Sequence, residues 1–396
     1  MKYVVVIMDG ASGWPLPEHG NRTCLELART PNLDAMARVG VLGMARTVPP
    51  MMEASSACAC MSVLGYDPMV YYKGRAGIEA KSMGIPVGKD EVVFRCNLVA
   101  VRDGRMWDYS AGHISTEEAR KLIAGLNEAL ANEWIQFYPG VSYRHILKLN
   151  GRIGTLSAIC TPPHDIPDQP ISGFLPKGSG SAFLRDLMRR SEAVLAEHPV
   201  NVARRARGDI PATTIWLFWG TGQIPDMPPF RKVYGLNGAM TSGVDLLGGL
   251  AQMAGMDVLK IPGVTDSMDN DYGAQVTGAL TALDRHDLVV IHVESPDEAG
   301  HSGSFEEKVR AIERIDAEVL DKIHSRRGDA LRLLVMPDHP TPVEIRTHCP
   351  DPVPFLLWGA GFTSNGANRF TENEAKKTGL SIDPGYNIMS RLTGRV

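Results

Sequence analysis

Two short polar stretches in the C-terminal part of the sequence carry side chains that could bind metal ions. Each directly follows a run of apolar, mostly β-branched or leucine residues, 288–293 and 331–336. Such runs, bounded by proline and glycine, are typical of buried parallel strands. The polar side chains just beyond them are Asp297, His301, Asp338 and His339. Because open α/β sheets bind ligands at the carboxyl ends of their strands, these residues predict a site for a divalent transition metal such as Mn²⁺ or Zn²⁺.

A helix start is the alternative interpretation of the first stretch. Ser295 would be the N-cap, Pro296 would occupy the first helical position, and Glu298 would reach back to the cap. This arrangement accounts for Glu298 without any chemistry. It does not account for an aspartate and a histidine four residues apart, or for a second aspartate–histidine pair at the same topological position. His348, nine residues after His339, adds another imidazole, so the whole set favours a metal site.

The N-terminal region supplies a further carboxylate and two serines. Residues 3–8 predict a buried strand, and Asp9 follows it directly, as in the two C-terminal stretches. From about Ser55 the residues are small and apolar, which predicts a buried helix that starts at Ser55 and Ser56. A serine at this position is usually an N-cap. The amides and dipole of a helix N-terminus also suit a nucleophile that carries a phosphoryl group.

The composition is that of an ordinary globular protein. The 396 residues are 44% hydrophobic and 22% charged, and the formal net charge of -4 gives no reason to expect binding to nucleic acid or to an anionic membrane. No stretch approaches the roughly 20 apolar residues of a membrane helix, and the first apolar run is too short for a signal peptide. The six cysteines include no Cys-x-x-Cys pair. They predict reduced thiols and therefore a cytoplasmic protein.

The order of the predicted elements divides the chain into three parts. Residues 1–71 begin a core of alternating strands and helices, and residues 208–396 continue it, starting with a strand at 213–219. Residues 72–207 instead contain hairpin signals such as Asp103-Gly104, which indicate a smaller inserted α+β domain. We therefore predict an α/β fold whose core has a mostly parallel sheet flanked by helices, with a substrate domain inserted into it.

Several individual elements are predicted with defined limits. Thr30 and Pro31 begin a helix that ends near Gly40, and a capping box at 115–118 opens a helix to about residue 134. A strand at 143–149 is expected to end in a second hairpin-type turn. The small residues at 240–256 predict a helix.

Motifs spread over nearly the whole chain resemble those of one enzyme family. The candidate metal ligands and Ser56 resemble the metal set of the alkaline phosphatase superfamily. More closely, the chain resembles the archaeal-type cofactor-independent phosphoglycerate mutases, and a bacterial branch of them sometimes labelled proposed homoserine kinase. The motifs are Thr30–Asp34, Leu64–Pro68, Tyr72–Arg75, Gly77–Ala80, Phe94–Asn97, Ser110–Gly112, Pro163–Asp165 and Asp351–Pro354. The bacterial branch is indicated by Asp108–His113, Pro162–Asp165 and His198–Asn201.

The resemblance implies an alkaline-phosphatase-like core with two divalent metal ions. One ion would be bound by Asp9, Ser56, Asp338 and His339, and the other by Asp297, His301 and His348. Mn²⁺ is the ion most expected, with Mg²⁺, Co²⁺ or Zn²⁺ as alternatives and no need for 2,3-bisphosphoglycerate. An ungapped count back from Leu64–Pro68 selects Ser56 over Ser55 as the nucleophile. The implied reaction interconverts 3-phosphoglycerate and 2-phosphoglycerate through a phosphoserine, as in glycolysis and gluconeogenesis.

The resemblance also implies a set of substrate contacts. These residues are Arg75, Arg95, Asn97, Arg144, His164 and Asp165. The guanidinium fork suits a phosphate or a carboxylate because it makes two parallel hydrogen bonds. The alternative for Arg95 and Arg144 is a charge on a strand surface, and the alternative for His164 and Asp165 is a structured loop.

Some residues depart from the family pattern. The nucleophilic serine is normally preceded by glycine and followed by aspartate, whereas here Ser55 and Ala57 flank it. Arginines that often accompany the Ser-Ala-Gly motif are replaced by Tyr109 and His113. The alternative functions are therefore phosphotransfer or phosphatase activity on another small phosphorylated metabolite, such as homoserine phosphate, or a catalytically silent family member. The absence of a Gly-x-x-x-x-Gly-Lys-Ser/Thr loop argues against a kinase.

Overall fold

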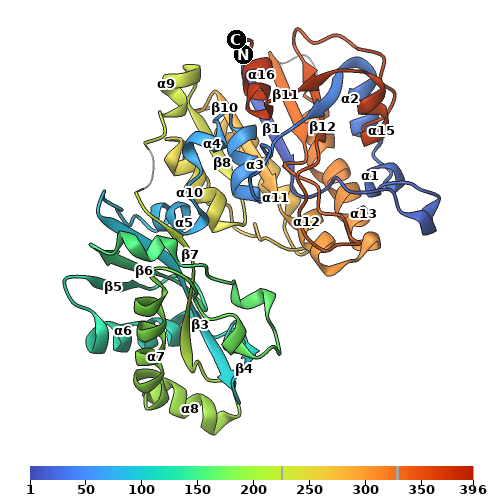
Figure 1. Cartoon of the computed structure of the whole chain (residues 1–396). Helices are drawn as coiled ribbons and strands as arrows, with labels where there is room; N and C mark the ends of the chain where they lie inside the picture. The colour runs from blue at the N-terminus through green and yellow to red at the C-terminus, as the bar shows by residue number, and fades with distance from the viewer. Residues whose placement is uncertain (224–225, 327–329, 396) are drawn as a thin grey trace. The chain divides into compact units, whose positions relative to one another are not determined.

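The chain folds into two compact units, and Figure 1 colours it along the sequence. The computed structural model describes residues 1–223, 226–326 and 330–395. The first unit is formed by Met1–Tyr72 and Asp226–Val396, and the second by Lys73–Pro225. Within the described parts of the chain, none of the helices combines the length and the apolar character needed to cross a membrane.

The first unit is built on an eight-stranded sheet with the order β13-β2-β12-β11-β1-β10-β8-β9. Its strands are β1 (Lys2–Met8), β2 (Val41–Ala45), β8 (Gly238–Thr241), β9 (Asp257–Val258), β10 (Leu288–Val293), β11 (Leu331–Met336), β12 (Val353–Gly359) and β13 (Ser381–Ile382). Among the described strands of this sheet, β12 alone runs antiparallel to its neighbours β11 and β2, and the other pairs are parallel. The predicted α/β class with a mostly parallel sheet is confirmed.

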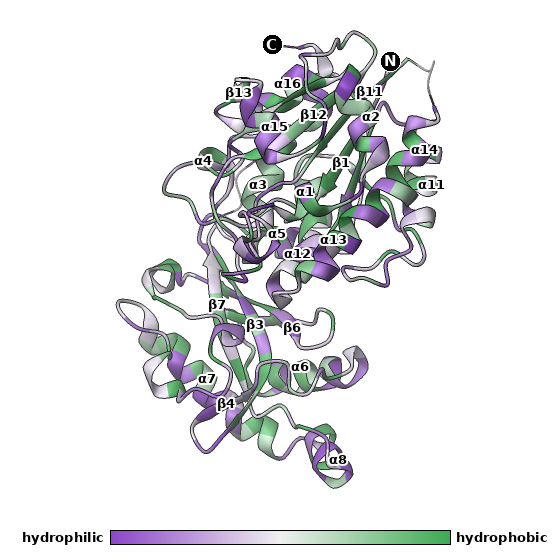
Figure 2. Ribbon diagram, turned by 90° about the vertical axis from the view of Figure 1, so that its right-hand side faces the viewer, coloured by the Kyte–Doolittle hydropathy of each residue, from purple (hydrophilic) through white to green (hydrophobic). Residues whose placement is uncertain are grey.

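Helices flank this sheet (Figure 1). They are α1 (Cys24–Leu27), α2 (Pro31–Val39), α3 (Ser56–Val63), α4 (Pro68–Tyr71), α9 (Phe230–Tyr234), α10 (Asp245–Met253), α11 (Tyr272–Ala282), α12 (Ser295–Ser302), α13 (Phe305–Arg314), α14 (Asp321–His324), α15 (Glu372–Lys377) and α16 (Ile388–Thr393). A π-helical segment, Ile315–Leu320, joins α13 to α14. Val4 and Val6 of β1 share one buried apolar cluster with residues of α2, α11 and α13. In Figure 2 the central strands are mostly green and the helices carry both colours, as expected when helices bury a parallel sheet.

The second unit contains a five-stranded sheet of β3 (Glu91–Arg102), β4 (Arg105–Asp108), β5 (Ile135–Tyr138), β6 (Arg144–Asn150) and β7 (Thr214–Thr221). Its pairs are antiparallel, and the predicted hairpin at Asp103-Gly104 joins β3 to β4. The helices are α5 (Arg75–Ser82), α6 (Thr116–Leu130), α7 (Ser181–Ala196) and α8 (Pro199–Arg207). Apolar residues of β3 and β6 pack with α6 and α7 on one face of this sheet.

The strand predicted at 213–219 was assigned to the core sheet, and this assignment is wrong. This strand, β7, pairs antiparallel with β3, so it belongs to the second unit. The second unit therefore extends past the expected boundary at residue 207. The error has a physical cause, because a strand's own residues report that it is buried and do not report which strand it pairs with.

Other local differences involve strands that the sequence interpretation missed. The helix expected at 240–256 is shorter than predicted. Its first residues belong to strand β8, which ends at Thr241, and the helix α10 begins at Asp245. The helix α6 ends at Leu130 because the chain then turns into the unpredicted strand β5. The turn at Asn150-Gly151 leads into a 3-10 helix, Ile153–Ser157, so it forms no hairpin.

The start of α2 is stabilised from outside the helix. Thr30 is the N-cap residue, as predicted, but its side chain accepts no capping hydrogen bond. Asp316, in the π-helical segment, instead accepts hydrogen bonds from the backbone N–H groups of Leu33 (2.8 Å) and Asn32 (3.2 Å). Burial raises the pKa of the Asp316 carboxyl group, while these hydrogen bonds oppose the increase. A distant carboxylate thus replaces the expected local cap.

We predict that Asp316→Ala destabilises the first unit, because it leaves buried N–H groups at the start of α2 without acceptors. The expected loss is about 1–3 kcal/mol of unfolding free energy, measured by urea unfolding followed by circular dichroism. Asp316→Asn is the matched control, since it retains an acceptor oxygen and should lose less stability. Equal losses in both variants would contradict this role for the carboxylate.

Candidate active site

Three neighbouring strands deliver acidic side chains to one edge of the core sheet. In β11, β1 and β10, Met336 is paired with Ile7 and Met8 is paired with Val293, so the strands end side by side. Asp9 and Asp338 follow the ends of β1 and β11, and Asp297 lies in the first turn of α12 after β10. Parallel pairing therefore brings together residues that are far apart in the sequence.

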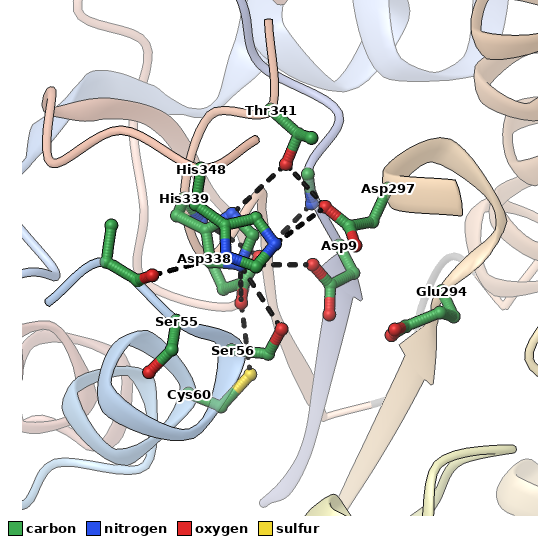
Figure 3. Close-up of polar contacts among 12 residues, drawn as sticks. Asp9, Ser55, Ser56, Cys60, Glu294, Asp297, Asp338, His339, Thr341 and His348 are labelled. Atoms are coloured by element: carbon green, nitrogen blue, oxygen red, sulfur yellow. Dashed lines mark hydrogen bonds and ion pairs between the residues drawn. The ribbon is translucent and has the colours of Figure 1, made fainter. Parts of the chain in front are cut away.

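The first candidate metal group consists of Asp9, Asp338 and His339, all of which are fully buried. His339 Nε2 lies 3.5 Å from Asp9 Oδ1 and 3.4 Å from Asp338 Oδ2. Ser56 Oγ is 3.2 Å from the same nitrogen atom. These four residues are the set that the sequence predicted for one ion, and the structure brings them together (Figure 3).

The second candidate metal group consists of Asp297, His301 and His348. Asp297 and His301 lie one turn apart on α12, and Asp297 Oδ2 is 3.1 Å from His301 Nε2. His348 Nε2 lies 3.4 Å from Asp297 Oδ1 and 3.0 Å from His301 Nε2. The three residues expected to bind a second ion are thus also adjacent.

The Nδ1 atoms of His301 and His348, which face away from this group, determine the tautomer of each ring. His301 Nδ1 lies 3.0 Å from the carbonyl oxygen of Arg346, and His348 Nδ1 lies 3.2 Å from that of Ala54. A carbonyl oxygen only accepts, so each Nδ1 carries hydrogen, and each Nε2 presents a lone pair when its ring is in the neutral form. Two lone pairs converging at 3.0 Å require a proton or a cation between them. This is the arrangement that histidine metal ligands normally adopt.

Burial and pairing shift the pKa values of these groups in different directions. Burial lowers the pKa of His339 to about 4. For His301, burial favours the neutral form, but the hydrogen bond with Asp297 outweighs it and raises the pKa to about 9. Burial, Asp338 and Asp297 raise the pKa of Asp9 well above its usual value. For Asp297, burial is outweighed by hydrogen bonds with His301 and His348, which hold its pKa well below the usual value.

The donor set fits divalent cations. Both groups offer only carboxylate oxygens and imidazole nitrogens, with a serine hydroxyl beside the first, which suits Mn²⁺ and Zn²⁺ better than a soft metal. Asp9 Oδ1 is buried and has no hydrogen-bond partner within the described structure. An uncompensated buried carboxylate oxygen is costly, and a cation would satisfy it.

The two adjacent serines have different environments. Ser55 is the N-cap of α3, and its Oγ accepts a hydrogen bond of 3.3 Å from the backbone N–H of Cys58. Ser56 is the first residue of the helix, and Figure 3 shows its hydroxyl pointing toward His339 and Asp338 while Ser55 points away. Ala57 is fully buried, so an apolar side chain occupies the position where the family pattern has an aspartate.

Sequence reasoning missed several residues around this site. His292, in β10, places Nε2 2.7 Å from Asp9 Oδ2, and Glu294 completes a third group of possible ligands with Asp9 and His292. Thr341 donates a hydrogen bond to Asp297 through Oγ1. A histidine inside an otherwise apolar strand was the available signal for His292. The alternative interpretation, a capping box with Ser295 as the N-cap, is wrong in its cap residue, because Glu294 is the N-cap of α12 and makes no side-chain capping bond.

The second unit gathers most of the predicted substrate contacts on one face of its sheet. Arg95 and Asn97 are two residues apart on β3 and therefore lie on the same face, and Asn97 is paired with Arg144 of β6. Arg95 Nε donates to Asn97 Oδ1 at 3.0 Å. Glu79 of α5 forms ion pairs with Arg95 and with Arg75 Nε, the latter at 3.0 Å. Glu79 was not predicted, and it organises two of the arginines.

The loop residues His164 and Asp165 lie in a short 3-10 helix. Their side chains approach to 3.7 Å. The His164 ring lies 5.6 Å from the Trp219 ring, and the Arg75 guanidinium group stacks over that ring at 4.6 Å. The structure therefore brings His164 near Arg75, while Asp165 projects a half-exposed carboxylate beside it.

Comparisons with known proteins agree with one family. Residues 37–201 match the family model described as 2,3-bisphosphoglycerate-independent phosphoglycerate mutase. The chain is 48% identical to a protein of that name from Methanothrix thermoacetophila over 395 residues, 99% of each chain. It is 45% identical to a protein named as a probable member from Geobacter sulfurreducens over 403 residues, covering all of both.

Solved structures show the same fold. A protein from Pyrococcus horikoshii is 27% identical with a TM-score of 0.81, covering 100% of this chain and 98% of that one. The cofactor-independent phosphoglycerate mutase from Thermoplasma acidophilum is 25% identical with a TM-score of 0.66, covering 100% and 99%. With near-complete coverage and almost half of the residues identical to the first relative, this chain belongs to the 2,3-bisphosphoglycerate-independent phosphoglycerate mutase family.

Proposed function

We propose that this protein interconverts 3-phosphoglycerate and 2-phosphoglycerate through a phosphoserine at Ser56. The observation that carries the proposal is the Ser56 hydroxyl, 3.2 Å from His339 Nε2 at the edge of two adjacent carboxylate–imidazole groups. Full-length relatives named as phosphoglycerate mutases support the same reaction.

We further propose that the two groups hold two divalent ions, with Mn²⁺ as the most suitable metal. Asp9, Ser56, Asp338 and His339 would bind one ion, and Asp297, His301 and His348 the other. When bound, such ions neutralise phosphoryl charge and increase the nucleophilicity of a coordinated hydroxyl group. Histidine and carboxylate ligands suit Mn²⁺, Co²⁺ and Zn²⁺, and the carboxylates suit Mg²⁺ as well.

The chain's own residues account for both half-reactions. In the first, Ser56 Oγ bonds to phosphorus, the bond from phosphorus to the glycerate oxygen breaks, and the serine proton balances the released hydroxyl group. In the second, the other hydroxyl group of the bound glycerate takes the phosphoryl group and Ser56 regains its proton. The start of α3 contributes a helix N-terminus, which favours negative charge at this position. Ser55 holds the backbone of that helix start in place.

The arginines of the second unit are proposed to recognise the anionic groups of the substrate. Arg75, Arg95 and Arg144 carry three positive charges, and Glu79 neutralises one of them. The remaining positive charge suits a small molecule that bears both a phosphate and a carboxylate. Asn97 supports Arg95, and His164 lies near Arg75 across Trp219.

A product assay separates this function from the alternatives raised by Ala57. The protein loaded with Mn²⁺ would be incubated with 3-phosphoglycerate, with phosphohomoserine and ADP, and with homoserine and ATP. The proposal expects 2-phosphoglycerate from the first mixture and no transfer in the others. The proposal would be contradicted if product formed only in the phosphohomoserine or homoserine mixture. It would also be contradicted if the protein bound metal and formed no product in any mixture.

Of the three predictions that rest on the proposed function, the first concerns metal removal. A chelator should abolish the mutase activity, and Mn²⁺ should restore it. Because each histidine ligand must lose its proton to bind metal, Mn²⁺ affinity should decrease as pH falls below about 9, the pKa of His301. The decrease should be about tenfold per pH unit for each proton displaced. Calorimetric titrations at several pH values test this, and full activity of a protein shown to be metal-free would contradict it.

The second prediction separates the two serines. Ser56→Ala should fold, bind Mn²⁺ and lose nearly all turnover, because no oxygen remains to receive the phosphoryl group. Ser55→Ala is the matched control, and it should keep its phosphorylated form while losing about 1 kcal/mol of stability as the N-cap of α3 disappears. Phosphopeptide mapping after trapping with substrate measures the difference. Phosphate on Ser55, or normal turnover in Ser56→Ala, would exclude the assignment.

The third prediction concerns Arg144. Arg144→Gln should lower kcat/KM roughly 10- to 100-fold, mainly through KM, because a charge-assisted hydrogen bond to substrate is lost. Lys148→Gln is the control, since Lys148 lies four residues further along β6 and is paired with Glu91 at 2.8 Å. Steady-state kinetics should show little change for the control. The same loss in both variants would indicate a general effect of sheet charge.

A further inference from the structure

Lys308 is a fully buried lysine behind the candidate metal groups. It lies in the first turn of α13, and its Nζ donates hydrogen bonds to the carbonyl oxygens of Ser12 (2.9 Å) and Thr341 (2.6 Å). Both partners are main-chain oxygens. Removing an ammonium group from water is costly, so a lysine in this position needs a compensating role.

The two carbonyl groups belong to the two loops that carry the first metal group. Ser12 lies three residues after Asp9, and Thr341 lies two residues after His339. The loops also contact each other directly, because the Thr341 N–H donates to the Ser12 carbonyl oxygen at 3.1 Å. Lys308 therefore binds the point where the loops following β1 and β11 meet.

Thr341 connects this point to both metal groups. Its Oγ1 donates a hydrogen bond to Asp297 and lies 3.3 Å from His339 Nδ1. An oxygen that donates its only hydrogen to Asp297 must accept from His339 Nδ1–H, which leaves His339 Nε2 with the lone pair that a metal requires. Thr341 thus orients one ligand of each group.

The surroundings of Thr341 leave little room for adjustment. A Cβ atom on Gly10 would lie 2.6 Å from Thr341 Oγ1, and one on Gly300 would lie 2.7 Å from the Thr341 carbonyl oxygen. Gly300 is next to His301 on α12, and only Gly303 and Ser304 separate α12 from the helix of Lys308. A shift of the Thr341 backbone would therefore be transmitted to ligands in both groups.

A second buried residue, Glu372, binds other polar atoms of the Ser12 loop than Lys308 does. Glu372 Oε1 accepts hydrogen bonds from Ser12 Oγ at 2.8 Å and from the Gly13 N–H group at 3.3 Å. These bonds fix the hydroxyl group of Ser12 and the following amide but do not reach Thr341. Lys308 bonds both the Ser12 loop and the Thr341 loop and connects them to α13.

We propose that Lys308 is a positioning residue that fixes the two metal-binding groups relative to each other. Its ammonium group joins three chain segments, and each of these segments either carries metal ligands or directly follows one that does. The inference rests on the proposed function in one respect, namely that the two groups bind divalent ions. Lys308 is not among the candidate metal ligands or the proposed substrate contacts, and its Nζ bonds to main-chain oxygens.

The test uses Mn²⁺ as the probe, with the full-length protein and its Lys308→Met variant. Calorimetric titration should show Mn²⁺ affinity weakened about 10- to 100-fold in the variant, as is typical when the support of metal ligands is removed. Electron paramagnetic resonance should show loss or change of the spin-coupled signal from the Mn²⁺ pair, because the spacing of the two ions is no longer fixed. The value of kcat should fall while KM remains near that of the parent protein, since the proposed substrate arginines lie in the second unit.

Ile312→Ala is the matched control for general damage to α13. Ile312 is buried one turn after Lys308 on the same helix and belongs to the apolar cluster of the core. The control should unfold more easily and keep the affinity and the coupled spectrum of the parent. Lys308→Gln provides a second, smaller change, which should restore part of the affinity because its amide N–H groups can still donate to carbonyl oxygens. If Lys308→Met does not fold, the same measurements apply to Lys308→Gln against the parent.

The outcomes separate this inference from the proposed function. A folded Lys308 variant with the parent's Mn²⁺ affinity and spectrum would overturn the positioning role while leaving the proposed function intact. Equal losses in the Lys308 variants and Ile312→Ala would overturn it as well. A parent protein that binds no Mn²⁺ would contradict the proposed metal centre, and the positioning role with it.

Discussion

Repulsion among buried carboxylates at the ends of β1, β10 and β11 is the physical constraint on which the core unit depends. Asp9 and Asp338 are fully inaccessible, Asp297 is 2% exposed, and Glu294 stands next to them. Burial and neighbouring negative charge raise the pKa of both Asp9 and Glu294 well above their usual values. Charges of one sign repel strongly where water is excluded. The site is therefore incomplete without positive charge, and the imidazoles, Lys308 and divalent ions are the available sources.

The parts of the fold that could be predicted are those encoded over short distances. Strands β10 and β11 were predicted with the observed limits, because a strand buried on both faces is a continuous apolar run between turn residues. The candidate metal ligands were inferred from these strands, since a strand end fixes where the next few side chains lie. The choice of pairing partner for each strand could not be predicted from such local patterns. β7 looked like a core strand but pairs with β3, and β8 was hidden at the start of a sequence rich in small residues.

The site shows the same division between ligands and their supports. Asp, His and Ser at characteristic positions pointed to a metal-assisted phosphoryl transfer. Residues that act through others gave weaker signals, because nothing in the local sequence of Lys308 or Thr341 indicates a partner hundreds or tens of residues away. Glu79 is similar, since its role depends on Arg95, which lies on a strand that α5 precedes. Ser55 and Ser56 are a different case, because the count back from Leu64–Pro68 chose between them and the structure then shows Ser55 as the N-cap and Ser56 as the first residue of α3.

The second unit solves the opposite electrostatic problem, which is how to hold several positive charges close together on a sheet face. Arg95 is 7% exposed at its side chain and would be costly to bury alone, but Glu79 and Asn97 bond to it within the unit. Arg75 is held by Glu79 and by the ring of Trp219. Groups fixed in this way lose less conformational freedom when an anion binds. In each unit the fold holds groups of like charge close together, carboxylates in the first unit and arginines in the second. The carboxylates are therefore suited to binding cations, and the arginines to binding anions.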